Sequence, residues 1–561
     1  MASVSVTVTA LPPISNQALL PDQRQAIPDP VRAGLARGWK VFGGPHQALP
    51  EQLSCDVLVI GSGAGGGVTA EILTRAGLDV VIVEEGPLRS STDFHQLEAE
   101  AYPELYQESA SRKTADKAIN ILQGRCVGGS TTVNWTSSFR TPPDTLAFWR
   151  QHHGLSELSA EALAPWFEEA ERRLHIGDWL TPPNLNNELL RTGAQKLGIE
   201  AHGIRRNVRG CWNLGSCGMG CPTNAKQSML VTTLPAALNA GARLLVQTRA
   251  LRLVHDGSRV SAVECAAMKP DGRPAERLLR VQARHVVLSG GAINSPALLL
   301  RSGAPDPHGR LGRRTFLHPV VLSAAVFDQP VQGWQGAPQT IYTDHFLHTQ
   351  PIDGPIGFKL EAPPLHPLVF SGTLCGFGQS QTALLRQFPN THTLLALLRD
   401  GFHPESPGGQ VRLKGDGTPE LDYPLNAFVM DGARRALLAM AEIQFAAGAR
   451  QVLPVHEQAG LVSRWADAKS MIERLPMEPL LTRVVSAHVM GGCALSGDAS
   501  GGVLRPDGRH WQLANLSVHD GSVFPTSIGA NPQLSIYGLV NRLATALAPA
   551  LGGRAVRWLD S

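Results

Sequence analysis

A glycine-rich turn between two apolar runs constrains this chain more than any other feature. Residues 55–86 read CDVLVIGSGAGGGVTAEILTRAGLDVVIVEEG, which predicts a strand, a tight turn, a helix and a second strand. Both runs are apolar almost throughout, as in strands that are covered on both faces of a parallel sheet. The segment therefore predicts a βαβ unit of an α/β fold.

The turn has the spacing G-x-G-x-x-G over residues 61–66. Glycines there permit a tight turn and let a pyrophosphate approach the backbone at the helix N-terminus. Glu84, at the end of the second strand, is expected to accept hydrogen bonds from a ribose diol, with Glu85 as its rival. A flavoprotein that uses NAD would carry two such fingerprints, and the sequence has one, so the layout favours a single FAD. The predicted contacts in this unit are Gly61, Gly63, Ala64, Gly65, Gly66 and Glu84.

Well-patterned α/β segments recur near residues 285–303 and again towards residue 550. A chain of 561 residues is too long for one hydrophobic core. We therefore expect a Rossmann-like FAD-binding domain built from discontinuous segments, and a second lobe, the substrate-binding domain, formed by the irregular stretches between them. The predicted segments are 51–145, 229–318 and 484–561 for the FAD-binding domain, 146–228 and 319–483 for the substrate-binding domain, and 1–50 for an N-terminal extension.

Composition and charge narrow the possible partners. The 50 Lys and Arg residues against 47 Asp and Glu leave a formal charge of +3, without a basic run, so no nucleic-acid partner is expected. The N-terminus lacks the basic and apolar regions of a secretion signal, and no apolar run of about 18 residues predicts a membrane span. We expect a cytoplasmic protein, with peripheral contact to a membrane as an open possibility.

Five segments, taken together and in order, resemble the glucose–methanol–choline (GMC) family of flavoenzymes. They are GSGAGGG…VVIVEEG, GRCVGGSTTVNW, GGAINSPALLLRSG, SAHVMGGCALSG and VHDGSVFPTSIGANP. The last two are similar to the branch of cholesterol oxidases and long-chain alcohol oxidases. The resemblance implies FAD-dependent oxidation of an alcohol to an aldehyde or ketone. It also implies that the substrate-binding domain is an α+β domain with an antiparallel sheet.

By this resemblance, His488 corresponds to the active-site histidine and Asn531 to its polar partner. A neutral imidazole with a pKa near neutrality suits a general base that takes the hydroxyl proton while a hydride passes to flavin N5. An amide can bind the substrate oxygen without adding charge. We also expect Asn531 to cap the last helix, with Pro532 in its first turn, so that the helix N-terminus points at the flavin.

Further contacts to FAD are expected from two of the resembling segments. The first segment should pass beside the flavin, and the second should reach the ribityl and pyrophosphate region. Some family members attach FAD through a histidine at the place of Val133, so the cofactor here is expected to be non-covalent. The predicted residues are Arg125, Gly129, Ser130 and Asn134 in the first segment, and Asp520 and Gly521 in the second.

Three cysteines lie close together at Cys211, Cys217 and Cys221, followed by Lys226. The spacing does not match a standard iron–sulfur or zinc pattern, and no fourth ligand is evident. We therefore predict a tight structural loop and no metal site. Similar loops followed by a lysine occur in relatives of the long-chain alcohol oxidases.

The substrate is expected to be apolar: a long-chain, aromatic or sterol-like alcohol. This expectation rests on the branch resemblance and on the apolar segment 362–378. The alternatives are a sugar or polyol dehydrogenase, a light-driven fatty-acid decarboxylase on the same scaffold, and a flavin-binding protein without turnover. The electron acceptor, O₂, a quinone or a cytochrome, is left open by the sequence.

Overall fold

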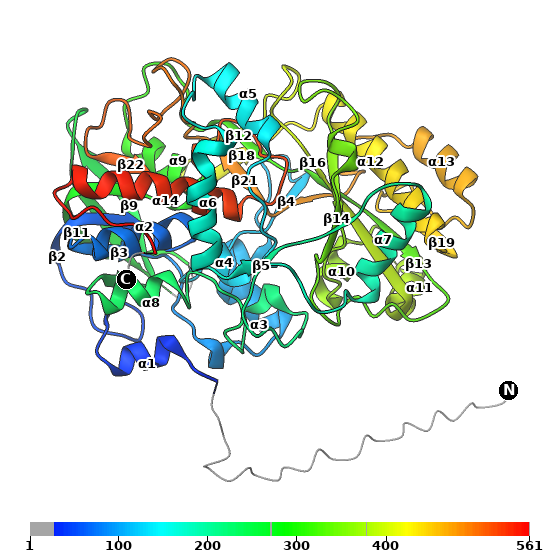
Figure 1. Ribbon diagram of the computed structural model, residues 1–561, viewed down its shortest axis with the longest axis horizontal. Coiled ribbons are helices and arrows are strands. Elements are labelled where there is room, and N and C mark those ends of the chain that lie inside the picture. Colours follow the sequence, from blue (N-terminus) through cyan, green and yellow to red (C-terminus); the bar gives the residue numbers. More distant parts are fainter. Residues whose placement is uncertain (1–26, 270–271, 377, 560–561) are drawn as a thin grey trace, which may run out of the picture.

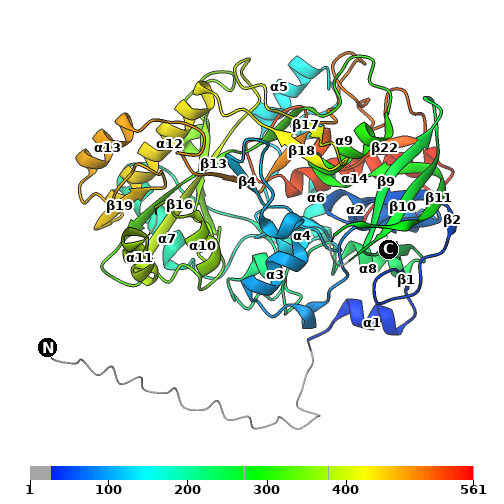
Figure 2. The same cartoon turned by 180° about the vertical axis from the view of Figure 1, so that it is seen from behind.

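The computed structural model describes residues 27–269, 272–376 and 378–559 (Figure 1). Residues 1–26 of the predicted N-terminal extension lie outside the described residues. Two large sheets form the centres of two neighbouring lobes, and Figure 2 shows the same division from behind. This mixed architecture confirms the predicted α/β fold class.

The first lobe is built on an eight-stranded sheet with the order β1-β8-β3-β2-β11-β10-β9, in which β22 also pairs with β11. Pairings from β1 to β11, and between β11 and β22, are parallel, whereas β10 and β9 add an antiparallel meander. The strands are β1 Lys40–Phe42, β2 Gln52–Ile60, β3 Val80–Val83, β8 Arg243–Leu245, β9 Thr248–His255, β10 Val260–Met268, β11 Pro274–Leu288 and β22 Leu516–Val518.

The parallel part of this sheet has the apolar strands that its sequence predicts. All four residues of β3 are buried, as are the last four of β2, because helices and further chain cover both faces. Helix α2 (Ala64–Arg75) joins β2 to β3 and packs against the final helix α14 (Gln533–Ala550). The predicted βαβ unit is thus present at the centre of the first lobe.

The second lobe contains an eight-stranded, mostly antiparallel sheet with the order β4-β20-β13-β16-β15-β14-β6, in which β19 also pairs with β13. The long helix α12 (Ala427–Ala446) packs on β13 and β16 and forms a second hydrophobic core with them. The strands are β4 Ile119–Ile121, β6 His202–Gly203, β13 Val320–Val326, β14 Ile341–Thr343, β15 Phe358–Glu361, β16 Thr391–Leu398, β19 Gln451–Pro454 and β20 Val484–Ser486.

Two smaller sheets and the remaining helices complete the described fold. A four-stranded antiparallel sheet has the order β18-β17-β12-β21, and β5 pairs with β7. The strands are β5 Ile176–Gly177, β7 Arg206–Asn207, β12 Arg313–Leu317, β17 Gly409–Leu413, β18 Pro419–Asp422 and β21 Val489–Gly491. The helices are α1 Pro30–Ala36, α3 Glu98–Leu105, α4 Ser130–Val133, α5 Pro143–His153, α6 Ala160–Arg173, α7 Leu185–Lys196, α8 Thr233–Asn239, α9 Gly291–Ser302, α10 Pro367–Thr373, α11 Gln379–Arg386 and α13 Trp465–Arg474.

The division of the chain between the lobes differs from the predicted boundaries. Helices α5 and α6 fall in the segment predicted for the second domain, but Trp149 and Phe167 are buried in the core of the first lobe. Trp149 Nε1 donates to Thr526 Oγ1 (2.7 Å), and the ring of Phe167 packs on Gly538. Conversely, β4 and β20 come from segments predicted for the first domain and pair in the second sheet. Tertiary contacts, which local patterns do not encode, set these boundaries.

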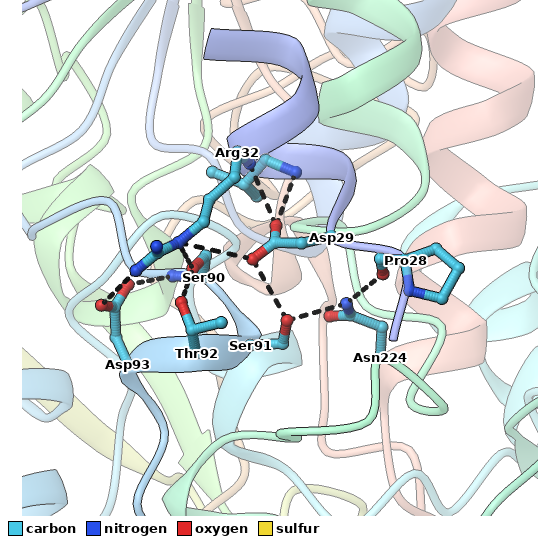
Figure 3. Close-up of polar contacts among 9 residues, drawn as sticks. Pro28, Asp29, Arg32, Ser90, Ser91, Thr92, Asp93 and Asn224 are labelled. Atoms are coloured by element: carbon cyan, nitrogen blue, oxygen red, sulfur yellow. Dashed lines mark hydrogen bonds and ion pairs between the residues drawn. The ribbon is translucent and has the colours of Figure 1, made fainter. Parts of the chain in front are cut away.

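The described part of the N-terminal extension is attached to the first lobe. β1 adds a strand to the edge of its sheet, and Asp29 caps α1 by accepting hydrogen bonds from the backbone of Val31 and Arg32. Figure 3 shows that Asp29 also accepts a hydrogen bond from Ser91 Oγ (3.2 Å), while Asn224 Nδ2 donates to that same hydroxyl (3.0 Å). These contacts join α1 to the loop that follows the cysteines.

Candidate active site

A cavity of about 1210 Å³ opens at the glycine turn after β2 and is lined by residues of both lobes. It brings together 14 of the 15 residues predicted for the site; the exception is Gly66, which packs beneath the turn, where an added Cβ would lie 1.9 Å from the carbonyl oxygen of Gly61. The lining residues are Gly61, Gly63, Ala64, Gly65, Glu84, Arg125, Gly129, Ser130, Asn134, His488, Asp520, Gly521, Asn531 and Pro532.

The glycine turn has the geometry that a pyrophosphate site requires. Gly61 has a φ of +103°, and it lies so close to the end of the neighbouring strand β11 that an added Cβ would be 2.2 Å from the carbonyl oxygen of Ser289. Gly63 stands at the N-terminus of α2, and a Cβ there would meet no protein atom closer than 3.7 Å. The open side of Gly63 faces the cavity, so a side chain introduced there would clash with a bound ligand and not with the protein. The turn therefore fits the FAD that the sequence predicts.

Glu84 and Glu85 have different surroundings at the end of β3. The Glu84 carboxylate accepts hydrogen bonds from Ser62 N (3.1 Å), Ser62 Oγ (2.6 Å) and Gly86 N (2.9 Å), and burial raises its pKa. A carboxylate has about four acceptor positions, so Glu84 retains about one, which can accept from one hydroxyl of a ribose. Glu85 instead binds Arg125 (2.8 Å) and Arg249 (2.7 Å). Burial alone would raise the pKa of Glu85, but these guanidinium groups lower it to about 2.

The segment beside the turn is held mainly by protein contacts. The backbones of Gly63 and Gly129 approach so closely that a Cβ on Gly129 would lie 2.8 Å from the Gly63 Cα. Ser130 Oγ accepts a hydrogen bond from the Gly124 amide (2.9 Å), and Asn134 Nδ2 donates to Gln533 Oε1 (2.7 Å). The polar groups of Ser130 and Asn134 thus support the wall of the cavity as well as lining it.

Asp520 is buried and accepts four hydrogen bonds from the protein itself. The donors are the amide of Gly291 (2.8 Å), Ser295 Oγ (2.5 Å), and the amide (2.8 Å) and Oγ (2.5 Å) of Ser522. Burial raises its pKa, and the donors oppose that rise. These contacts satisfy the carboxylate and join the start of α9 to the end of β22, which positions Gly521 in the cavity wall.

His488 lies in the turn between β20 and β21, and its ring faces a second histidine. His488 Nδ1 is 3.0 Å from Nδ1 of His318, and the two rings meet edge to face. Burial, and then the nearby charge of Lys359, lower the pKa of His488 to about 3. This direction departs from the expected pKa near neutrality, and the imidazole is neutral at physiological pH.

Asn531 does not cap the last helix, contrary to the expectation from sequence. Helix α14 begins at Gln533, Pro532 occupies the capping position, and no side chain caps it. The Asn531 amide instead accepts a hydrogen bond from Lys359 Nζ (3.0 Å) and donates to Glu361 Oε2 (3.4 Å). Lys359 and Glu361 form a buried ion pair (2.9 Å). A buried ammonium has a stronger demand for acceptors than a helix N-terminus that opens on a cavity.

Sequence reasoning missed His318, Lys359 and Glu361. His318 follows β12 directly, and nothing nearby in the sequence points to its partner, which lies 170 positions later. Lys359 and Glu361 had a usable signal in the sequence, because two opposite charges at alternate positions of the short strand β15 share one face. Such a pair in a buried strand predicts an internal ion pair.

The cysteine loop lies against the wall of the cavity. Lys226 Nζ, which is buried, donates to the carbonyl oxygens of Thr132 (2.9 Å), Asn134 (2.6 Å) and Cys217 (2.7 Å). Its ammonium thereby joins the loop to the segment beside the glycine turn. Among the residues that the structure describes, no group of three or more His, Cys, Asp or Glu side chains is arranged to hold a metal ion.

Family models match most of the chain. Two models described as GMC oxidoreductase match residues 102–320 and 404–539, and one described as FAD binding domain matches residues 56–126. The last range contains the glycine turn and Glu84. The predicted cofactor, FAD, is confirmed by these matches.

Individual relatives agree with the family models. An uncharacterized GMC-type oxidoreductase (y4nJ) of Sinorhizobium fredii is 30% identical over 88% of this chain and 95% of its own length. Long-chain-alcohol oxidase FAO4A of Arabidopsis thaliana is 28% identical over 87% of this chain and 68% of its own length. Among solved structures, pyridoxine 4-oxidase shares the fold with a TM-score of 0.66 at 19% identity, covering 88% of this chain and 99% of that chain.

Proposed function

Because the chain belongs to the GMC oxidoreductase family, we propose that it oxidises an alcohol to the aldehyde or ketone, with His488 and Asn531 contacting the substrate oxygen. FAD, when bound, supplies the hydride acceptor. The observation that carries this proposal is that His488 and Asn531 line the same cavity as the glycine turn and Glu84. Gly61, Gly63, Glu84 and Gly129 would hold the cofactor.

The roles that the protein's own groups take differ from the sequence expectation. A group with a pKa of about 3 is a weak general base, so His488 is better suited to binding the substrate oxygen than to removing its proton. Asn531 is fixed by Lys359 and holds the same oxygen without adding charge. Together they orient the carbon–hydrogen bond that is broken.

An apolar alcohol is the proposed substrate class, since relatives named as long-chain-alcohol oxidases align along most of the chain. A polyol substrate is the second candidate. It is favoured by one relative, 6'''-hydroxyparomomycin C oxidase of Streptomyces lividus, which is 27% identical over 94% of this chain and 98% of its own length.

We further propose that FAD is non-covalent, because Val133 occupies the place of the linking histidine, and that the protein is cytoplasmic or peripheral at a membrane. No helix in the described ranges is long and apolar enough to cross a bilayer.

The test is anaerobic reduction of the purified yellow protein, in darkness, by fatty, aromatic, sterol and sugar alcohols. Loss of the oxidised flavin absorbance with an alcohol supports the proposal, and darkness removes any light-driven reaction. His488→Ala and Asn531→Ala should retain FAD but slow bleaching by about two to three orders of magnitude. The exposed His308→Ala serves as the control. Failure of every alcohol to bleach the flavin, or wild-type rates in both variants, would contradict the assignment.

Non-covalent attachment is tested separately by acid precipitation of the protein. Free flavin should remain in the supernatant. A yellow pellet would show that the cofactor is bound covalently at another residue.

A further inference from the structure

Two buried cations that form no ion pair carry a further inference. In the part of the chain that the structure describes, five Lys and Arg side chains are buried, and three of them are paired with a carboxylate: Arg112 with Glu108 (2.9 Å), Lys359 with Glu361 (2.9 Å) and Arg399 with Asp144 (2.7 Å). The other two are Arg206 and Lys226, which are 1% and 3% exposed. Their hydrogen bonds within the described residues go to carbonyl oxygens, a hydroxyl group and a thiol, none of which cancels a charge. Burial of an unpaired charge is costly, so the arrangement calls for an explanation.

Lys226 is held as an ammonium ion by its acceptors. Its Nζ donates to the main-chain carbonyl oxygens of Thr132 (2.9 Å), Asn134 (2.6 Å) and Cys217 (2.7 Å). Three such acceptors require three N–H groups, which an ammonium has and a neutral amine lacks. Burial lowers the pKa of Lys226, but the three carbonyl groups retain the proton. The side chain therefore carries its positive charge.

Arg206 holds the same stretch of chain two residues further on. Its Nε donates to Thr136 Oγ1 (2.9 Å), and its Nη1 donates to the carbonyl oxygens of Pro338 and, at 3.4 Å, Gln339. Thr136 has a φ of +65°, a conformation that a β-branched residue rarely adopts without support from its surroundings. A guanidinium group is not deprotonated in a protein, so this second contact is charged as well.

The stretch that both cations hold is residues 132–137, which we call the wall segment. It follows Gly129, where a Cβ would lie 2.8 Å from the Gly63 Cα of the glycine turn, and its Asn134 Nδ2 donates to Gln533 Oε1 (2.7 Å), two residues after Asn531. The wall segment therefore lines the cavity between the glycine turn and Asn531. Arg206 and Lys226 do not line the cavity themselves, so they lie behind the wall and act through it.

We infer that Arg206 and Lys226 are positioning residues that fix the wall segment and give it a positive potential, which favours the reduced form of the bound FAD. A hydride brings one negative charge to the flavin ring, and fixed positive charge nearby stabilises that product. The inference rests on the proposed function for one point alone, that the ring lies towards the Asn531 end of the cavity.

The expected effect follows from the charge that is not cancelled. At an effective dielectric constant of about 20, two unit charges about 10 Å apart change an equilibrium roughly tenfold. Loss of one cation should therefore weaken the binding of reduced FAD about tenfold more than that of oxidised FAD. For a two-electron couple, this factor lowers the midpoint potential by about 30 mV.

The test is the midpoint potential of the bound FAD, measured anaerobically against a reference dye and without any alcohol. Lys226→Gln keeps two N–H donors but removes the charge, and Lys226→Met removes both. Each should lower the potential by about 30 mV or more. The control is Lys196→Gln, which removes an exposed charge on α7 and should leave the potential unchanged. A potential in Lys226→Gln equal to that of the wild type would overturn the inference, because hydrogen bonds alone would then explain the role of Lys226.

Fluorescence titration of the apoprotein with FAD separates a role in the potential from a role in affinity. A cation that serves only to retain the cofactor would weaken both redox forms equally, and the unchanged potential would contradict the inference. Arg206→Gln should also lower the potential, whereas Arg206→Lys keeps the charge and should restore most of it.

The wild type provides a test even if the variants do not fold. Its bound FAD should have a higher midpoint potential than free FAD at the same pH, and an equal or lower value would overturn the inference. The proposed function fails separately: if no alcohol bleaches the flavin but the potential falls in Lys226→Gln, the inference stands and the proposed function does not. Bleaching by alcohols with unchanged potentials in the variants gives the reverse result.

Discussion

The buried ion pair between Lys359 and Glu361 gives the sharpest stability prediction. Both side chains are at most 2% exposed, and one carboxylate oxygen of Glu361 faces Lys359 Nζ at 2.9 Å. Replacing Lys359 by Met keeps most of the side-chain length but leaves the buried carboxylate without its cation. Removing one partner of a buried pair costs about 3–5 kcal/mol, a large part of a folding free energy of roughly 5–15 kcal/mol.

This loss of folding free energy should be measurable as a lower melting temperature. At roughly 2–4 °C per kcal/mol for a unit of 150–250 residues, Lys359→Met should lower Tm by roughly 6–20 °C. The double variant Lys359→Met/Glu361→Gln removes both charges and should recover most of that loss, because a neutral pair has no desolvated ion to compensate.

The assay is thermal unfolding of the wild type, both single variants and the double variant at pH 7, followed by circular dichroism. The four values form a double-mutant cycle that isolates the coupling between the two residues. Additive effects of the single variants, or a Lys359→Met protein that melts within about 1 °C of wild type, would refute the description of this pair as a structural ion pair.

Three further predictions concern the cofactor turn, acid stability and the cysteine loop. Gly63→Ala should reduce FAD content but leave the Tm of the flavin-free protein unchanged, because its Cβ has room in the protein and none beside a pyrophosphate. Gly65→Ala should lower the Tm of the flavin-free protein, because its Cβ would lie 1.6 Å from a backbone oxygen of His519. The pKa of His392 is lowered by burial to about 3, so below its ordinary value of 6.5 the unfolded chain binds a proton that the folded state does not. Stability should therefore fall as pH falls from about 6.5 to 3, and His392→Asn should make that slope shallower in melts recorded across the range. Lys226→Met should cost about 1–3 kcal/mol for each carbonyl left without a donor, and should release flavin on gel filtration more readily than wild type.

The parts of the fold that the sequence predicts well are those set by local pattern. The strand, glycine turn and helix at residues 52–75 depend on apolar runs and on glycine at positions that a side chain would block. In the same way, the apolar run of β22 predicts a strand that ends just before Asp520 and Gly521, and β22 pairs in parallel with β11 of the same sheet. Parallel strands bring their carboxyl ends together, so these distant motifs meet at one cavity.

The parts of the fold and of the site that the sequence predicts poorly depend on residues far away along the chain. Asn531 has the local setting of a helix cap, but a lysine 172 positions earlier binds its amide. The sequences of helices α5 and α6 are amphipathic. This pattern predicts that each helix buries an apolar face, but it does not predict which lobe covers that face. The pKa of His488 depends on burial and on Lys359, and neither follows from the residues around it.

The walls of the cavity have a consequence for how the holoprotein is made. They include Gly61 to Gly65 at one end of the sequence and Asp520 to Gln533 at the other. At about 5–20 residues per second, a ribosome needs roughly half a minute to a minute and a half to span that interval. During this time the nascent chain carries a phosphate-binding turn that lacks its opposite wall. All the groups that line the cavity are therefore present only after the last helix of the chain has been synthesised.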